Sequence, residues 1–151
     1  MSAIKKNILL LGFTFCSLLL MSADWKTDFK KAKEEAKTTH KYILLTFTGS
    51  DWCPPCIKTK KEIFSKEVFT KFADEHLVLV DADFPRLKRN RLSRDQVKKN
   101  EELAEQYNKE GVFPFTLLLD ANGKVLKEWR GFPGVSAEAF VSQIKEHEHS
   151  K

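Results

Sequence analysis

The chain has 151 residues, of which 42% are hydrophobic and 31% charged, and its formal net charge is +5 at pH 7. This length is enough for one hydrophobic core and short for two ordinary domains. The apolar content is too high for a disordered chain. The basic excess comes without a zinc-finger spacing, an aromatic RNA-binding signature or a sustained basic helix, so we expect no nucleic-acid partner.

The first 23 residues have the pattern of an export signal. Two lysines precede an apolar run of 14 residues, Ile8–Met21, and a pair of small residues ends at Ala23. The run is shorter than the roughly 20 residues of a spanning helix, which favours cleavage after Ala23 over a retained anchor. We therefore predict a signal peptide over 1–23, a domain over 24–151 and a periplasmic or secreted location. Membrane contact is expected only through an uncleaved signal.

After the signal, the sequence alternates between helical and strand patterns. Apolar residues recur at helical spacing over 25–36, which predicts an amphipathic helix. The apolar runs 42–47 and 77–83 are typical of strands buried on both faces. Between these strands, apolar residues in helical register predict two helices, with Ser65 as the cap where one helix ends and the second begins.

The second half of the chain begins with a basic segment and ends with a hairpin and a helix. Residues 85–99 hold seven basic residues and one acid, which predicts a surface insertion. Such a run is either a solvated loop or a docking surface for an acidic partner or an anionic membrane. Asn100 is placed to cap a short helix, an apolar strand over 115–119 begins a hairpin, and Ser136 is placed to cap the last helix.

This order of elements predicts an α/β fold, a three-layer sandwich around a central mixed sheet. Its central crossovers imply parallel strands, and its late hairpin adds antiparallel ones. Cys53 then follows the carboxyl end of a central strand, where α/β sheets usually place their chemistry. Cys56 falls in the first turn of the next helix.

Cys53 and Cys56 enclose two prolines and are the only cysteines left once a cleaved signal removes Cys16. In an oxidising compartment such a pair is a disulfide or a redox couple. A helix N-terminus favours the thiolate, so we expect Cys53 to be the nucleophile and Cys56, more buried, to resolve a mixed disulfide. Pro55 suits the first helical turn. No charged group or imidazole between the cysteines stabilises the reduced form, which favours a reductant.

Other roles for the pair are less consistent with the sequence. A structural disulfide would close a very short loop and stabilise the chain little. Metal binding needs more ligands than one such pair supplies, and the four histidines have no recognised finger spacing, so we expect no metal and no other cofactor. The alternatives that stay open are a net disulfide oxidase or isomerase, and a non-enzymatic metal-binding or client-holding module.

Three motifs resemble the thioredoxin-like family: DWCPPC after a buried strand, GVFPFTLLLD later in the chain, and NGK in the hairpin. Within that family the chain resembles the exported, single-domain members related to the C-terminal domain of DsbD and to the periplasmic reductase DsbH. The resemblance implies that Cys53 attacks and Cys56 resolves. It also implies that Trp52 and Phe113 border the substrate and that Pro114 is a cis-proline facing the disulfide.

The same resemblance implies an exported thiol:disulfide oxidoreductase that reduces disulfides of client proteins and takes electrons from a membrane thiol donor of the DsbD type. One position departs from the family. Many thioredoxins have a buried acid where this chain has Phe47, six residues before Cys53. Asp51, Asp81 and Asp83 are the acids near the motif and the next strand, and the sequence assigns none of them to that role.

Overall fold

A five-stranded mixed sheet forms the centre of the protein in the computed structural model, which describes residues 23–147. In spatial order the strands are β1 (Trp25–Lys26), β3 (Leu77–Asp83), β2 (Tyr42–Thr48), β4 (Phe115–Leu119) and β5 (Val125–Arg130). The first three are parallel, and β4 runs antiparallel to both β2 and β5. The predicted mixed sheet is therefore confirmed.

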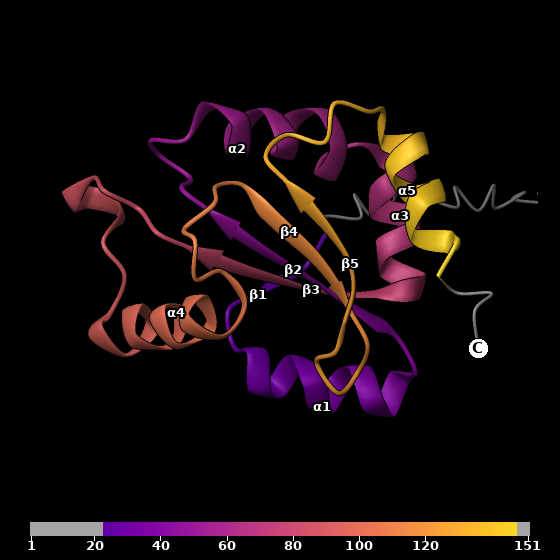
Figure 1. Ribbon diagram of the computed structural model, residues 1–151, viewed down its shortest axis with the longest axis horizontal. Coiled ribbons are helices and arrows are strands. Elements are labelled where there is room, and N and C mark those ends of the chain that lie inside the picture. Colours follow the sequence, from indigo (N-terminus) through magenta and orange to yellow (C-terminus); the bar gives the residue numbers. More distant parts are fainter. Residues whose placement is uncertain (1–22, 148–151) are drawn as a thin grey trace, which may run out of the picture.

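Helices cover both faces of this sheet, so the α/β sandwich is confirmed (Figure 1). One face carries α1 (Phe29–Thr39) and α4 (Arg94–Tyr107), and the other carries α2 (Pro54–Thr59), α3 (Glu67–His76) and α5 (Ala137–Lys145). A π-helix, Lys60–Phe64, continues α2, and a 3₁₀ turn, Lys88–Asn90, follows β3. Within residues 23–147, no helix has the length and apolar character needed to cross a membrane. The predicted signal lies outside the described residues except for Ala23.

Alternation along β2 sends its side chains into two separate apolar clusters. Leu44 packs in the cluster beneath α3 and α5, whereas Phe47 packs in the cluster beneath α1 and α4. Thr46 and Thr48 share the side of Leu44, because successive side chains of a strand point to opposite faces. The carboxyl end of β2 therefore presents hydroxyl groups to the α2 side and an aromatic ring to the other.

The first predicted helix starts later than its apolar spacing suggested. Trp25 belongs to β1 and pairs with Leu79, at the edge of the sheet. The helix begins at Phe29, where the carboxylate of Asp28 accepts a hydrogen bond from the backbone N–H of Lys31 at 3.1 Å. This cap ends the extended segment, so Trp25 keeps its place in the core without being helical.

Of the three predicted caps, Asn100 is wrong, and Ser65 is right for the end of one helix but not for the start of the next. Ser65 ends the π-helix, and α3 begins after Lys66, which makes no side-chain capping bond. Asn100 lies inside α4, which Ser93 caps. The buried amide of Asn100 donates to the backbone carbonyl of Asp83 at 2.8 Å, so this side chain ties α4 to β3.

The cap at Ser136 is confirmed, because its hydroxyl accepts a hydrogen bond from the N–H of Ala139. The predicted insertion over 85–99 is only partly a loop. Residues 85–93 connect β3 to α4, whereas residues 94–99 form the first turns of α4. The helix starts there because Ser93 caps it, with Asp95 in its first turn.

Candidate active site

Cys53 and Cys56 lie just beyond the carboxyl end of β2 and form a disulfide, with an S–S distance of 2.11 Å. Cys53 is the N-cap of α2, and its Sγ accepts a hydrogen bond from the backbone N–H of Cys56 at 3.3 Å. Pro54 and Pro55 occupy the first helical positions, where no backbone N–H is required. The predicted placement of the pair is confirmed, and reduction would leave the Cys53 sulfur facing a backbone N–H that favours its thiolate.

Both cysteines are almost fully buried, with exposed fractions of 3% for Cys53 and 4% for Cys56. The prediction that Cys56 is the more buried of the two is therefore wrong for the disulfide form. Around the pair, the two prolines and Ile57 are exposed, so an approaching chain first meets an apolar rim.

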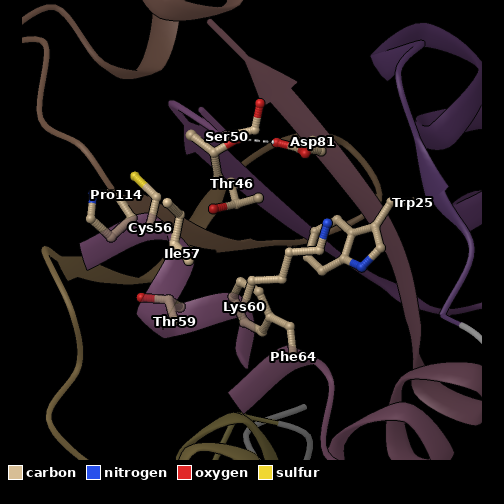
Figure 2. Close-up of a pocket in the computed structure, with 11 residues that line it drawn as sticks. Trp25, Thr46, Ser50, Cys56, Ile57, Thr59, Lys60, Phe64, Asp81 and Pro114 are labelled. Atoms are coloured by element: carbon tan, nitrogen blue, oxygen red, sulfur yellow. Dashed lines mark hydrogen bonds between the residues drawn. The ribbon is translucent and has the colours of Figure 1, made fainter. Parts of the chain in front are cut away.

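The Phe113–Pro114 peptide bond is cis, as the resemblance implied. Figure 2 shows Pro114 beside the sulfur of Cys56, and both residues line a cavity that is described below. In the part of the chain that the structure describes, no hydrogen bond uses the backbone N–H or carbonyl of Phe113. This backbone is thus available to an extended chain laid against it.

Trp52 joins the redox pair to the segment that follows β3. Its indole Nε1 donates to the carbonyl of Phe84 at 2.7 Å, and its ring meets that of Phe113 at a centroid distance of 5.4 Å. The guanidinium of Arg86 lies over the same ring, 3.7 Å from its centroid. A Cβ at Gly49 would come within 2.3 Å of the indole, so this position has to be glycine for the ring to lie there.

A cavity of about 220 Å³ lies against Cys56 on the α2 side of the sheet (Figure 2). Its polar lining includes the hydroxyl groups at the end of β2, the amine of Lys60 and the carboxyl of Asp81. The hydroxyl of Thr48 donates to Asp81 at 2.7 Å. The pKa of Asp81 is raised to about 6, mainly by burial; the Thr48 hydrogen bond and Lys60 act to lower it, and nearby Asp83 acts to raise it.

The acid beside the redox pair therefore comes from β3. Phe47, at the position where many thioredoxins have a buried acid, lies on the opposite face of β2. Asp81 shares a face of β3 with Leu79, and this alternation is the sequence signal that could have pointed to it. Asp83 lies close by, and its carboxylate accepts hydrogen bonds from the N–H and hydroxyl of Ser50.

Asp51 has a structural role that sequence reasoning missed. Its carboxylate accepts hydrogen bonds from the backbone N–H groups of Arg86 and Leu87, at 2.9 and 3.0 Å, and from the amide of Asn90 at 2.9 Å. The Arg86 N–H is the main cause of the lowered pKa of Asp51. Asp51 thus holds the segment after β3 against the loop that carries the cysteines.

Across residues 23–147, no three His, Cys, Asp or Glu side chains gather in a way that could hold a metal ion.

A family model described as a thioredoxin-like domain matches residues 29–148. The disulfide bond reductase DsbH of Chlamydia pneumoniae is 42% identical over 121 residues, which cover 80% of this chain and 70% of that protein.

Solved structures give a consistent result. A DsbH oxidoreductase superposes with a TM-score of 0.75 at 40% identity, covering 83% of each chain. The oxidised C-terminal domain of DsbD from Neisseria meningitidis, 19% identical, has a TM-score of 0.55 over 82% of this chain and 97% of that one. The second comparison shows a shared fold, and the first extends to sequence over most of both chains.

Proposed function

Because the chain belongs to the thioredoxin-like family and is a protein-disulfide oxidoreductase, we propose that its net activity is the reduction of disulfides in exported client proteins. The observation that carries this proposal is the Cys53–Cys56 disulfide at the start of α2, beside a cis-proline. The DsbH relative is a disulfide bond reductase, which supports the direction of electron flow. The pattern of residues 1–23 supports export to the periplasm.

The reaction requires both cysteines in the reduced form. The Cys53 thiolate attacks one sulfur of the client disulfide, and the other client sulfur leaves as a thiolate that takes up a proton. Cys56, as a thiolate, then attacks the Cys53 sulfur and releases the second client thiol. The client gains two electrons and two protons, and the Cys53–Cys56 disulfide is formed. The Cys56 N–H that contacts the Cys53 sulfur supports the first step by stabilising the attacking thiolate.

The second step needs a group that accepts the proton of Cys56. Asp81 lines the same cavity as Cys56, and its pKa of about 6 is closer to that of a thiol than an ordinary carboxyl would be. A cavity of about 220 Å³ has room for water between polar groups. We assign Asp81 the role of exchanging this proton, either directly or through such water.

Client binding would use the surface around the cysteines. Trp52 and Phe113 form one side of this surface, and the unpaired backbone of Phe113 offers hydrogen bonds to an extended client segment. Such backbone pairing provides affinity while reading little of the client sequence. Electrons would come from a membrane thiol donor of the DsbD type, because each turnover leaves the pair oxidised.

The reduction potential of the Cys53–Cys56 pair tests the proposed direction. The purified protein is equilibrated with glutathione or dithiothreitol buffers, and the oxidised fraction is measured. We expect a value near that of thioredoxin, about −270 mV. A value near that of DsbA, about −120 mV, would contradict the proposal and make the protein a disulfide donor.

A further inference from the structure

Residues 85–93, which we name the basic loop, lie beside the redox pair. They contain four cations, Arg86, Lys88, Arg89 and Arg91, and no acid. Figure 1 shows that the loop between β3 and α4 projects beyond the same end of the sheet as the start of α2, where the cysteines are. The surface reached by a client disulfide is therefore bordered by a cluster of positive charge.

The basic loop is held in one position relative to the cysteines. The two residues before Cys53 hold it there: Asp51 binds the loop itself, and Trp52 binds Phe84, the residue just before the loop. Asp51 accepts from two backbone N–H groups of the loop, and Trp52 donates to the carbonyl of Phe84 and stacks under Arg86. A loop that only connects β3 to α4 has no need of such anchors at the active site.

The cationic side chains of the basic loop make no ion pair within the described chain, and the one carboxylate beside the loop, that of Asp51, binds its backbone N–H groups and Asn90. All four side chains belong to exposed residues, and none of the ion pairs among residues 23–147 includes them. Elsewhere, Lys98, Lys99 and Arg130 each lie within 4.0 Å of a carboxylate oxygen. Like charges gathered on a fixed loop repel one another, and a ligand of opposite charge relieves that repulsion.

We propose that the basic loop docks an acidic segment of the client protein while Cys53 attacks the client disulfide. This inference rests on the proposed function and adds a substrate class to it. A protein segment is favoured over a lipid surface because the loop shares Trp52 with the active site, and a bilayer lying on the loop would block approach to the cysteines. Exposed Leu87 adds an apolar contact within the same loop. The attraction steers acidic clients to the site and weakens with salt.

The first experiment measures binding without any redox step. Fluorescently labelled peptides of equal length, one carrying a run of glutamates and the other glutamines, are titrated with the oxidised protein at low salt. The loop variant carries Lys88→Gln, Arg89→Gln and Arg91→Gln. Its matched control carries the same charge change at exposed lysines of α1, which lies on the face of the sheet opposite α2: Lys30→Gln, Lys31→Gln and Lys37→Gln.

We expect the wild type and the control variant to bind the glutamate peptide about fivefold to tenfold more tightly than the glutamine peptide, and the loop variant to lose this preference. High salt should weaken the preference of the wild type for the glutamate peptide. Equal affinity for both peptides, or an equal loss in the loop and control variants, would overturn the proposal. So would loop-dependent binding to vesicles of anionic lipid by a protein that shows no preference between the peptides.

The second experiment separates docking from the proposed function. The run of glutamates or of glutamines is attached to a peptide that contains a disulfide. Reduction of this disulfide by the pre-reduced protein is followed in a single turnover. We expect faster reduction of the acidic peptide, with the advantage lost in the loop variant and the rate on the neutral peptide unchanged. Reduction of both at equal rates overturns docking and leaves the proposed function intact. Reduction of neither, together with loop-dependent binding, overturns the proposed function alone.

Discussion

The two faces of the sheet differ most where β2 and β3 end. On the α1 and α4 side, Phe47, Ala82 and Phe115 make this region apolar. On the α2 side, Thr46 and Asp81 line a cavity that reaches Cys56. The same two strands thus serve stability on one face and chemistry on the other, and substitutions on the two faces should change different measured quantities.

The largest effect is expected for Cys56→Ser, on the chemical side. This variant should lose turnover and accumulate a mixed disulfide between Cys53 and client proteins, because no second thiol remains to release them. Non-reducing gel electrophoresis of client mixtures would show the covalent adducts. Cys53→Ser is the matched control and should form none, and an absence of adducts with both variants would contradict the assigned roles.

On the stabilising side, Phe47→Ala should lower the free energy of unfolding by about 3–5 kcal/mol, because it leaves a cavity in a fully buried cluster. The measurement is denaturant unfolding of the oxidised protein. The reduction potential should change little, since the lost ring faces away from Cys56. A large shift in potential with stability unchanged would show that the two faces are not separable in this way.

Asp81→Asn should show a pH-dependent gain in stability. The pKa of Asp81 is raised from 3.8 to about 6 in the folded protein. The stability that protonated Asp81 contributes is therefore fully present below pH 4 and is lost as pH rises through 6. Asparagine carries no such penalty, and the variant should be more stable than the wild type by about 1–3 kcal/mol at pH 8 and nearly equal to it at pH 4.

Denaturant midpoints at the two pH values test this expectation for Asp81. The exposed Asp74→Asn variant controls for the loss of one negative charge. The same Asp81→Asn protein should release trapped client more slowly in single-turnover assays if the carboxylate accepts the Cys56 proton. Release at the wild-type rate across the pH range would contradict that role.

The smallest effect concerns a hydroxyl pair behind the cavity. Thr46 and Thr116 lie 3.2 Å apart through their Oγ1 atoms, and both residues are buried. Thr46→Val should cost about 1 kcal/mol, because it leaves the Thr116 hydroxyl without its partner. The double variant with Thr116→Val should recover most of this loss in denaturant unfolding. A double variant less stable than the single one would show that the pair is not an isolated contact.

The residues that sequence reasoning placed correctly depend on local patterns. Cys53 and Pro55 sit where a strand-to-helix junction puts them, and the cis bond before Pro114 followed from a resemblance to a family. Asp81 could not be assigned, because knowing which face of β3 it occupies requires knowing on which side α2 lies. Asp51 also escaped recognition, since its partners are backbone groups 35 and 36 positions away in the chain.

The caps show the same limit. Asn100 precedes an acidic stretch and has the local pattern of a cap, but its partner is the carbonyl of Asp83 on another element. Trp25 has helical spacing from Phe29, yet pairing with β3 decides its conformation. In both cases a long-range hydrogen bond outweighs the local propensity that a sequence displays.

The hydrogen bonds between Asp51 and the basic loop affect how the client preference of such a protein can change in evolution. Two of these three hydrogen bonds are to backbone N–H groups, which every amino acid except proline provides. Mutations at most loop positions can therefore alter side-chain charge without releasing the loop from the cysteines. Client preference and redox chemistry are then inherited as separable traits, and one can evolve while the other is conserved.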